Sequence, residues 1–435
     1  MNKKKEKINI VTLGCSKNIV DSEQLMHQLS VNNFEIVHNS NSFNYKTVII
    51  NTCGFINDAK QESIETILQF VDAKGKGKIN RIFIMGCLSE RYKHDLEKEF
   101  PEVDGIFGIN EFERILNNLN AEIFDRQLNN RFLTTPHHFA YLKIAEGCDR
   151  NCAFCAIPLI KGNYHSKSIE DIVNEARILV QKGVKELILI SQESTYYGID
   201  LYKKQSLTEL LTELAKIEEL EWIRLQYTYP AKFPLEVIEL MKKNPKICNY
   251  LDIPFQHISD KMLNLMKRGI SKKETYQLIT DIRKINPLIG IRTTLLVGHP
   301  GETEADFNEL VDFVKQIKFE RLGVFKYSHE EGTYAHDKYK DEVDEEVKEQ
   351  RAKRILEIQQ EISNNLNYNK IGKLFKVLID NKEGDNYIGR TEFDSPEVDG
   401  EVIITEYPGN IKIGNFYQVR VTDANEYDLY GKVIK

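Results

Sequence analysis

The segment "GCDRNCAFCAIP" at residues 147–158 places three cysteines within eight positions. Their spacing is Cys148-x-x-x-Cys152-x-x-Cys155. Thiolates are the usual protein ligands of iron–sulfur clusters. Because three cysteines bind only three irons of a four-iron cluster, one iron stays open for a substrate or a cofactor. The spacing therefore favours a cluster that takes part in chemistry.

Zinc is the alternative metal for such a group of thiols. A structural zinc site needs a fourth ligand, and the nearest histidines, His137, His138 and His165, stand at none of the usual zinc spacings. A binding module without catalysis, stabilised by zinc or by a cluster, remains a second class of function for this chain.

The composition is that of an ordinary globular protein with two or three domains. The chain has 435 residues, of which 41% are hydrophobic and 29% charged, so it can build sizeable cores. A formal net charge of −7 argues against a general nucleic-acid coat, although it allows a local basic patch. No apolar run approaches the roughly 18 residues of a membrane span. We therefore expect a cytoplasmic monomer that does not bind membranes, whose seven cysteines serve metal binding or catalysis.

Residues 1–125 alternate apolar strands with helical stretches. This alternation predicts an open parallel sheet with helices on its faces. The expected strands are 8–15, 46–53 and 81–87, and the expected helices are 18–29, 58–71 and 89–100.

Each of these three predicted strands ends in a cysteine: Cys15, Cys53 or Cys87. In open parallel sheets, ligands bind beyond the carboxyl ends of the strands. Cysteine is often buried, so thiols that merely finish apolar strands are the alternative. The repetition in three successive units favours one shared site.

Strand–helix alternation returns in a second region, 135–365, after a polar stretch at 116–138. It predicts a partial or complete barrel of parallel strands, with an active site at the carboxyl mouth. Cys148 comes just after the first strand and therefore falls at that mouth. The expected strands are 140–148, 186–193, 222–227, 250–255, 289–298 and 321–328.

The third region, 368–435, follows a long charged helix predicted at 341–366. Its short alternating strands and turns predict a small antiparallel barrel. The expected strands are 373–380, 386–393, 401–406 and 416–423.

With the aromatic Phe154 before its last cysteine, the motif resembles that of the radical S-adenosylmethionine (SAM) superfamily. The resemblance implies that Cys148, Cys152 and Cys155 hold a [4Fe-4S] cluster whose open iron binds the amino and carboxylate groups of SAM. It further implies that one electron from the cluster cleaves SAM to methionine and a deoxyadenosyl radical.

The whole chain resembles the methylthiotransferases of that superfamily. The resemblance implies an amino-terminal domain at 1–125, a radical SAM domain at 135–365 and a TRAM domain, a substrate-recognition module, at 368–435. It also implies separate electron and sulfur donors, which the sequence does not identify.

The same resemblance implies a second [4Fe-4S] cluster. The matching cysteines are Cys15 in "LGCSKN", Cys53 in "NTCGFI" and Cys87 in "GCLSER". Its open iron would hold the sulfur to be transferred.

One branch of the family modifies an adenosine of transfer RNA, and another modifies an aspartate of a ribosomal protein. The segment at 251–269 resembles the ribosomal branch, because the transfer RNA branch usually has Gln-Ser-Gly-Ser where this chain has "QHIS" at 256–259. We therefore expect methylthiolation of the β-carbon of an aspartate in small-subunit ribosomal protein 12, free or in the assembled subunit. Methylthiolation of an isopentenyl-type adenosine in transfer RNA is the alternative.

The charge of the last domain favours the same substrate. Residues 370–435 contain nine Lys/Arg and twelve Asp/Glu, a net charge of −3. An acidic module suits a basic ribosomal protein better than RNA phosphates. An ordinary solvated surface is the simpler interpretation of the same charges.

The chain departs from the family after the cysteine motif. Lys161, His165 and Lys167 stand where the family usually has arginines. Lysine cannot reproduce the planar, bidentate grip of arginine, so no contact with SAM is assigned to these side chains. Gln192 and Glu193 follow the second predicted strand at the mouth, where contact with SAM is plausible, although the short segment "SQES" is a weak signal. His257 also lies near the mouth, where contact with the substrate and a packed or solvated histidine are equally good explanations.

Overall fold

The computed structural model describes residues 5–124 and 129–434, which divide into two units. Unit 1 consists of the described residues up to Thr135, Tyr141–Asp149 and Ala156–Leu179. Unit 2 consists of Pro136–Ala140, Arg150–Cys155 and the described residues from Val180 onward.

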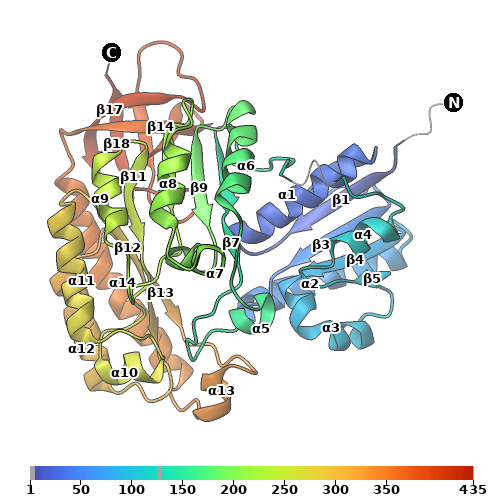
Figure 1. The fold of residues 1–435 in the computed structure, drawn as a ribbon, viewed down its shortest axis with the longest axis horizontal. Coiled ribbons are helices and arrows are strands. Elements are labelled where there is room, and N and C mark those ends of the chain that lie inside the picture. The colour runs from blue at the N-terminus through green and yellow to red at the C-terminus, as the bar shows by residue number, and fades with distance from the viewer. Residues whose placement is uncertain (1–4, 125–128, 435) are drawn as a thin grey trace. The chain divides into compact units, whose positions relative to one another are not determined.

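Unit 1 is built on a five-stranded sheet in the order β2-β1-β3-β4-β5 (Figure 1, blue to cyan). All of its neighbouring strands run parallel, which confirms the predicted open parallel sheet. The strands are β1 Lys7–Thr12, β2 Glu35–His38, β3 Thr47–Thr52, β4 Arg81–Gly86 and β5 Gly105–Ile106. The main helices are α1 Ser16–Val31, α2 Asn57–Gly75, α3 Cys87–Glu99 and α4 Phe112–Asn118.

Helices cover both faces of this sheet. Neighbouring residues of a strand point to opposite faces, so each strand contributes side chains to two cores. Ile49 packs with Leu25 of α1 and Leu116 of α4 in one core. Its neighbour Ile50 packs with Ile67 of α2 and other residues in a second core. The continuous apolar strands of the sequence reflect this burial on both faces.

The predicted first strand is too long. It was expected to reach Cys15, but β1 ends at Thr12. Gly14 has a positive φ of 86°, which an extended strand does not permit. The chain turns there into α1, and Cys15 is the residue that caps this helix.

A short part of unit 1 lies on either side of the last two cysteines of the motif in the sequence. It consists of β7 Ala145–Glu146, α5 Ile157–Lys161 and β8 His165–Ser166, with β7 and β8 paired antiparallel. Ala156 and Ile160 pack against Cys87 in a small buried cluster. The chain that follows the motif is therefore fixed beside one of the amino-terminal cysteines.

The second region forms a six-stranded sheet in the order β13-β12-β11-β10-β9-β6. It has two edges, so it is a partial barrel, one of the two forms expected. Its strands are β6 Phe139–Lys143, β9 Glu186–Ile190, β10 Trp222–Leu225, β11 Ile247–Asp252, β12 Gly290–Val297 and β13 Arg321–Lys326. Its helices are α6 Ile169–Gln181, α7 Ile199–Tyr202, α8 Leu207–Ala215, α9 Glu236–Lys243, α10 Asp260–Leu265, α11 Lys272–Ile285, α12 Glu304–Ile317, α13 Tyr334–Lys338 and α14 Glu345–Tyr368, with a short 3₁₀ helix at Ser194–Tyr196.

The carboxyl-terminal strands close into a small barrel in the order β14-β15-β16-β18-β17 (Figure 1, red). One pair, β16 with β18, is parallel, whereas the prediction was of an antiparallel barrel. Which strands pair, and in which direction, depends on tertiary contacts that the pattern of each strand does not encode. The strands are β14 Leu374–Glu383, β15 Asn386–Thr391, β16 Val402–Glu406, β17 Phe416–Ala424 and β18 Leu429–Val433.

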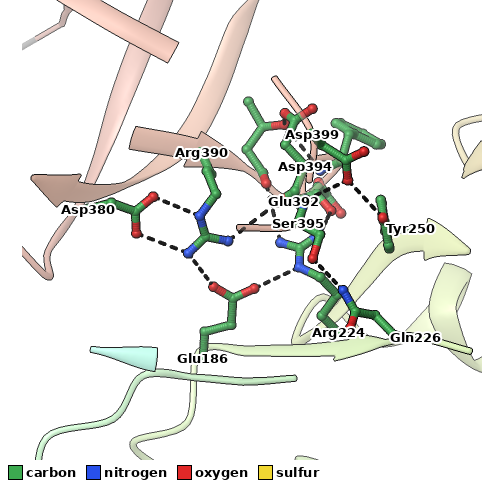
Figure 2. Close-up of polar contacts among 12 residues, drawn as sticks. Glu186, Arg224, Gln226, Tyr250, Asp380, Arg390, Glu392, Asp394, Ser395 and Asp399 are labelled. Atoms are coloured by element: carbon green, nitrogen blue, oxygen red, sulfur yellow. Dashed lines mark hydrogen bonds and ion pairs between the residues drawn. The ribbon is translucent and has the colours of Figure 1, made fainter. Parts of the chain in front are cut away.

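Buried ion pairs join this small barrel to the six-stranded sheet (Figure 2). Glu186 accepts hydrogen bonds from Arg224 at 2.7 Å and from Arg390 at 2.8 Å. Arg390 also pairs with Asp380 at 2.7 Å. Each of these charges has a partner, as burial requires. The arrangement fixes the small barrel on the ends of β9 and β10.

Within the described parts of the chain, no helix combines the length and the apolar character needed to cross a membrane.

Candidate active site

The structure brings Cys15, Cys53 and Cys87, here called the amino-terminal trio, to one edge of the sheet of unit 1. Cys15 and Cys53 lie in the turns that follow β1 and β3, and Cys87 is the first residue of α3, directly after β4. These three strands are neighbours in the sheet, so their carboxyl ends lie side by side. The thiols are close enough to interact electrostatically with one another.

Two glycines allow the turns of the trio to approach closely. A Cβ on Gly14 would lie 2.6 Å from Cβ and 2.8 Å from Sγ of Cys53. A Cβ on Gly54 would lie 2.7 Å from Cα of Leu88. Since real Cβ atoms do not come this close, side chains at 14 and 54 would force the turns apart.

Asn18, which the sequence analysis did not select, contacts the chain next to Cys15 and Cys53 and the thiol of Cys87. Its side-chain nitrogen donates to the carbonyls of Leu13 at 2.8 Å and Thr52 at 3.1 Å. Its oxygen faces Sγ of Cys87 at 3.8 Å. The one indication in the sequence is its position three residues after Cys15, on the first turn of a predicted helix.

Burial makes two of these thiols hard to ionise without a metal. Burial raises the pKa of Cys53, and it raises the pKa of Cys87 to about 12. Lys161, whose side chain is 3% exposed, is the charge that most strongly opposes this shift at Cys87. Cys15 is exposed. The trio therefore combines two sheltered thiols with one that solvent reaches.

The C-x-x-x-C-x-x-C motif is shared by the two units. Cys148 lies in unit 1, where its backbone N–H donates to the carbonyl of Gly162 at 3.2 Å. Cys152 and Cys155 lie in unit 2, and the backbone N–H of Cys155 donates to the carbonyl of Cys152 at 3.1 Å. All three side chains are of intermediate exposure.

Two arginines and a tyrosine surround Cys152. Arg268 is buried and donates to Sγ of Cys152 at 3.1 Å and to the carbonyl of Pro254 at 2.6 Å. The hydroxyl of Tyr229 lies 3.6 Å from the same sulfur. The guanidinium groups of Arg150 and Arg268 lie 4.3 Å and 4.4 Å from the centre of the Tyr229 ring. Arg268 therefore places a buried positive charge directly beside this sulfur.

The sequence did not single out Arg268 or Tyr229. Arg268 stands 116 positions from Cys152, in a segment selected only for its resemblance to one branch of the family. Only the folding of the sheet brings the two together.

The other residues considered near the predicted mouth have structural partners. Glu193 pairs with Arg150 at 2.9 Å, and burial raises its pKa against the opposing effect of that arginine. His257 is buried and lies 3.1 Å from Glu302. Cys248 is buried beside Trp222, as expected for a core residue.

The thiols of the amino-terminal trio and those of the C-x-x-x-C-x-x-C motif are suitable ligands for iron–sulfur clusters. Three thiols alone make a donor set for three irons. Within the described residues, no three His, Cys, Asp or Glu side chains converge on one point as ligands of a single ion would. A four-iron cluster binds each thiolate at a different iron, so its ligands stand apart. The hydroxyl of Ser16, beside Cys15, is buried without a hydrogen-bond partner and is available to a group bound there.

Comparisons with known proteins identify the same three regions. The model of the Radical SAM superfamily matches residues 142–314, that of the Uncharacterized protein family UPF0004 matches residues 7–108, and that of the TRAM domain matches residues 371–434.

Curated relatives match nearly the whole chain. It is 53% identical, over 99% of its length and 94% of the relative's, to a protein of Christiangramia forsetii named ribosomal protein uS12 methylthiotransferase RimO. It is 52% identical, over 99% of its length and 100% of the relative's, to the protein of that name from Phocaeicola vulgatus.

Solved structures share the fold. The radical S-adenosylmethionine methyltransferase TsrM from Kitasatospora setae, solved with cobalamin and a [4Fe-4S] cluster, superimposes with a TM-score of 0.54 at 15% identity over 77% of each chain.

The partial barrel, the cysteine motif at its first strand and the superfamily match define a radical SAM enzyme. Identity above 50% over nearly the full length narrows this class. The chain belongs to the RimO family of ribosomal protein uS12 methylthiotransferases.

Proposed function

We propose that this protein transfers a methylthio group to the β-carbon of an aspartate in ribosomal protein uS12. The observation that carries the proposal is the identity of 52–53% with proteins of that name over 99% of the chain. The two groups of cysteines in separate parts of the chain support it, because the reaction needs both a radical source and a sulfur source.

The chemistry of the substrate explains why this enzyme needs such cofactors. The β C–H bond of an aspartate is barely acidic, so no side chain acting as a general base removes its proton at a useful rate. Two [4Fe-4S] clusters and S-adenosyl-L-methionine, when bound, supply hydrogen abstraction and sulfur transfer. The chain's own task is to position these groups and to exclude water.

We assign Cys148, Cys152 and Cys155 to the cluster that binds SAM. Arg268 and Tyr229 hold Cys152 from the interior and keep water from that side of its sulfur. The intermediate exposure of the three side chains suits a site that a cofactor must enter.

We assign the amino-terminal trio to the cluster that carries the sulfur. Burial of Cys53 and Cys87 shelters that cluster, while the exposed Cys15 leaves one side accessible. Sulfur must be delivered to a substrate carbon over a short distance, so an accessible side is required.

The small barrel is proposed to recognise the substrate. It is acidic, and its buried ion pairs to β9 and β10 hold it on the sheet, as Figure 2 shows. A fixed acidic module presents one surface to a basic partner without paying an ordering entropy. We place the domains at 1–125, 135–365 and 368–435, and we propose that the protein works as a cytoplasmic monomer supplied by separate electron and sulfur donors.

The test is a reaction in vitro with both candidate substrates. Anaerobically reconstituted protein is incubated with SAM, a reductant, sulfide and either small ribosomal subunits or transfer RNA. We expect mass spectrometry to find one methylthio group on an aspartate of uS12 and none on adenosine. Modification of adenosine with unmodified uS12 would establish the alternative substrate instead.

A further inference from the structure

Four buried or half-buried charges form a cluster beside the amino-terminal trio. They are Asp21 of α1, Lys143 of β6, Glu146 of β7 and Lys161 of α5, here called the charge quartet. Lys161 Nζ lies 3.3 Å from the carboxylate of Glu146 and 3.6 Å from that of Asp21. Lys143 pairs with Glu146 at 2.6 Å and also with Asp21. All four residues belong to unit 1.

Lys161 is the cation of the quartet whose field acts on the thiols. Its helix, α5, packs on α3 through the buried contact of Ile160 with Cys87. Its ammonium group interacts electrostatically with both Cys87 and Cys15. Burial opposes the charged form, but the fields of Asp21, Glu146 and the thiols outweigh it and raise the pKa of Lys161. Its two ion pairs with carboxylates hold the buried side chain as a cation.

The quartet alone is electrically balanced, with two cations and two anions. Three thiolates holding a cluster add negative charge in the same sheltered place, where uncompensated charge is costly. Lys143 has its closest contacts with Asp21 and Glu146. Lys161 has the longer, weaker pairs, so its charge is left to act on the thiolates.

We propose that Lys161 is a positioning residue for the amino-terminal trio, whose buried positive charge stabilises the anionic thiolate-bound cluster and raises its reduction potential. The inference rests on the proposed function, because it requires a cluster at the trio. A point charge suffices for this role, so lysine serves where the family usually has an arginine, and no bidentate geometry is needed.

The experiment measures the reduction potential of that cluster alone. The full-length chain with Cys148, Cys152 and Cys155 replaced by alanine is reconstituted, and its iron and sulfide contents are counted. Potentiometric titration followed by electron paramagnetic resonance then gives the midpoint. We expect Lys161→Met to lower the midpoint potential by about 59 mV. For a one-electron couple, this shift lowers the ratio of reduced to oxidised cluster at a fixed potential roughly tenfold. Lys161→Arg should restore the original midpoint.

Two further variants distinguish an effect of the charge near the trio from a general disturbance of the structure. Lys167→Met removes the same charge six positions further along the chain, after β8, where Lys167 pairs with Glu175 at 3.0 Å, and should leave the midpoint unchanged. Asp21→Asn removes a negative charge that also acts on Cys87 and should raise the midpoint. If Lys161→Met does not fold, the shift in Asp21→Asn decides the question.

The outcomes distinguish this inference from the proposed function. A cluster present at the trio with an unshifted midpoint in Lys161→Met, or in Asp21→Asn, would overturn the role of Lys161 and leave the ligand assignment intact. If the chain with Cys148, Cys152 and Cys155 replaced by alanine bound no iron, both the role of Lys161 and the assignment of a cluster to the amino-terminal trio would be overturned.

Discussion

The two groups of cysteines differ in their spacing along the sequence, in their burial and in the charged residues beside them. The amino-terminal trio is assembled from three turns that are far apart in the sequence, and two of its thiols are buried. The C-x-x-x-C-x-x-C motif spans eight consecutive residues, and its thiols are all partly exposed. The cation that acts on Cys87 of the trio is the buried Lys161, whereas two arginines on the ring of Tyr229 lie near Cys152 of the motif.

This difference fits the functions proposed above for the two groups of cysteines. A site that exchanges SAM in every turnover needs an open side. Its ligands are close in the sequence, so they stay close in space without being buried. A site that stores reactive sulfur benefits from shelter, which only the packing of several elements provides. The contrast leads to four predictions.

Removal of one cysteine from either group should have the largest effect. Wild-type protein should contain about eight irons per chain, and Cys53→Ala or Cys152→Ala should contain about four. Both variants should lose methylthio transfer completely. Cys53→Ala should still release deoxyadenosine from SAM, whereas Cys152→Ala should not. Cys248→Ala, a buried cysteine outside both groups, is the matched control and should keep about eight irons. Retention of full iron in Cys53→Ala would contradict the assignment of the trio.

Arg268→Leu should destabilise the surroundings of the motif. It removes a buried cation that donates to Cys152 and Pro254, and loss of one partner from a buried charged contact costs about 4 kcal/mol. Urea unfolding of the metal-free protein measures the change. The neighbouring exposed residue provides a control, because Lys267→Met should cost less than about 1 kcal/mol. Equal effects of the two variants would show that Arg268 does not support the motif.

Acid should weaken unit 2 near the motif through His299, which contacts Phe154. Burial lowers the pKa of His299 to about 4, and its Nε2 atom has no hydrogen-bond partner. The unfolded chain takes up this proton near pH 6.5, so the folded state loses stability as pH falls from about 6.5 to about 4, by roughly 3 kcal/mol in total. His299→Phe should reduce this loss, as thermal unfolding between pH 4 and 7.5 can show. An identical pH profile in the variant would exclude His299 as the cause.

Glycine replacements should give the smallest effects and should compare the two groups directly. Gly14 of the trio and Gly147 of the motif both have positive φ, at 86° and 79°, and a Cβ on either would meet nearby atoms. Alanine at either position should cost about 2 kcal/mol and reduce iron in its own group only. Gly77 has a similar φ of 68° but open space around it, so Gly77→Ala should cost about 1 kcal/mol and leave iron unchanged.

Much of the fold could be read from patterns along the chain. The apolar strands and intervening helices predicted the parallel sheet of unit 1 and the sheet of unit 2. The edge strands β2 and β5 were missed because they are short and lack a strong apolar pattern. The end of β1 was placed too late because the turn at Gly14 depends on a backbone angle that sequence periodicity does not reveal.

The sequence by itself determined the spacing of the motif, the repetition of cysteines after strands and the family they indicate, since these are properties of neighbouring residues. Only the tertiary structure decided that the charge of Lys161 acts on Cys87, that Arg268 donates to Cys152, and that Glu186 joins Arg224 of the six-stranded sheet to Arg390 of the small barrel. These partners are set by strand order and by the packing of distant elements. A charged side chain looks the same in the sequence whether it remains in solvent or becomes buried against a thiol.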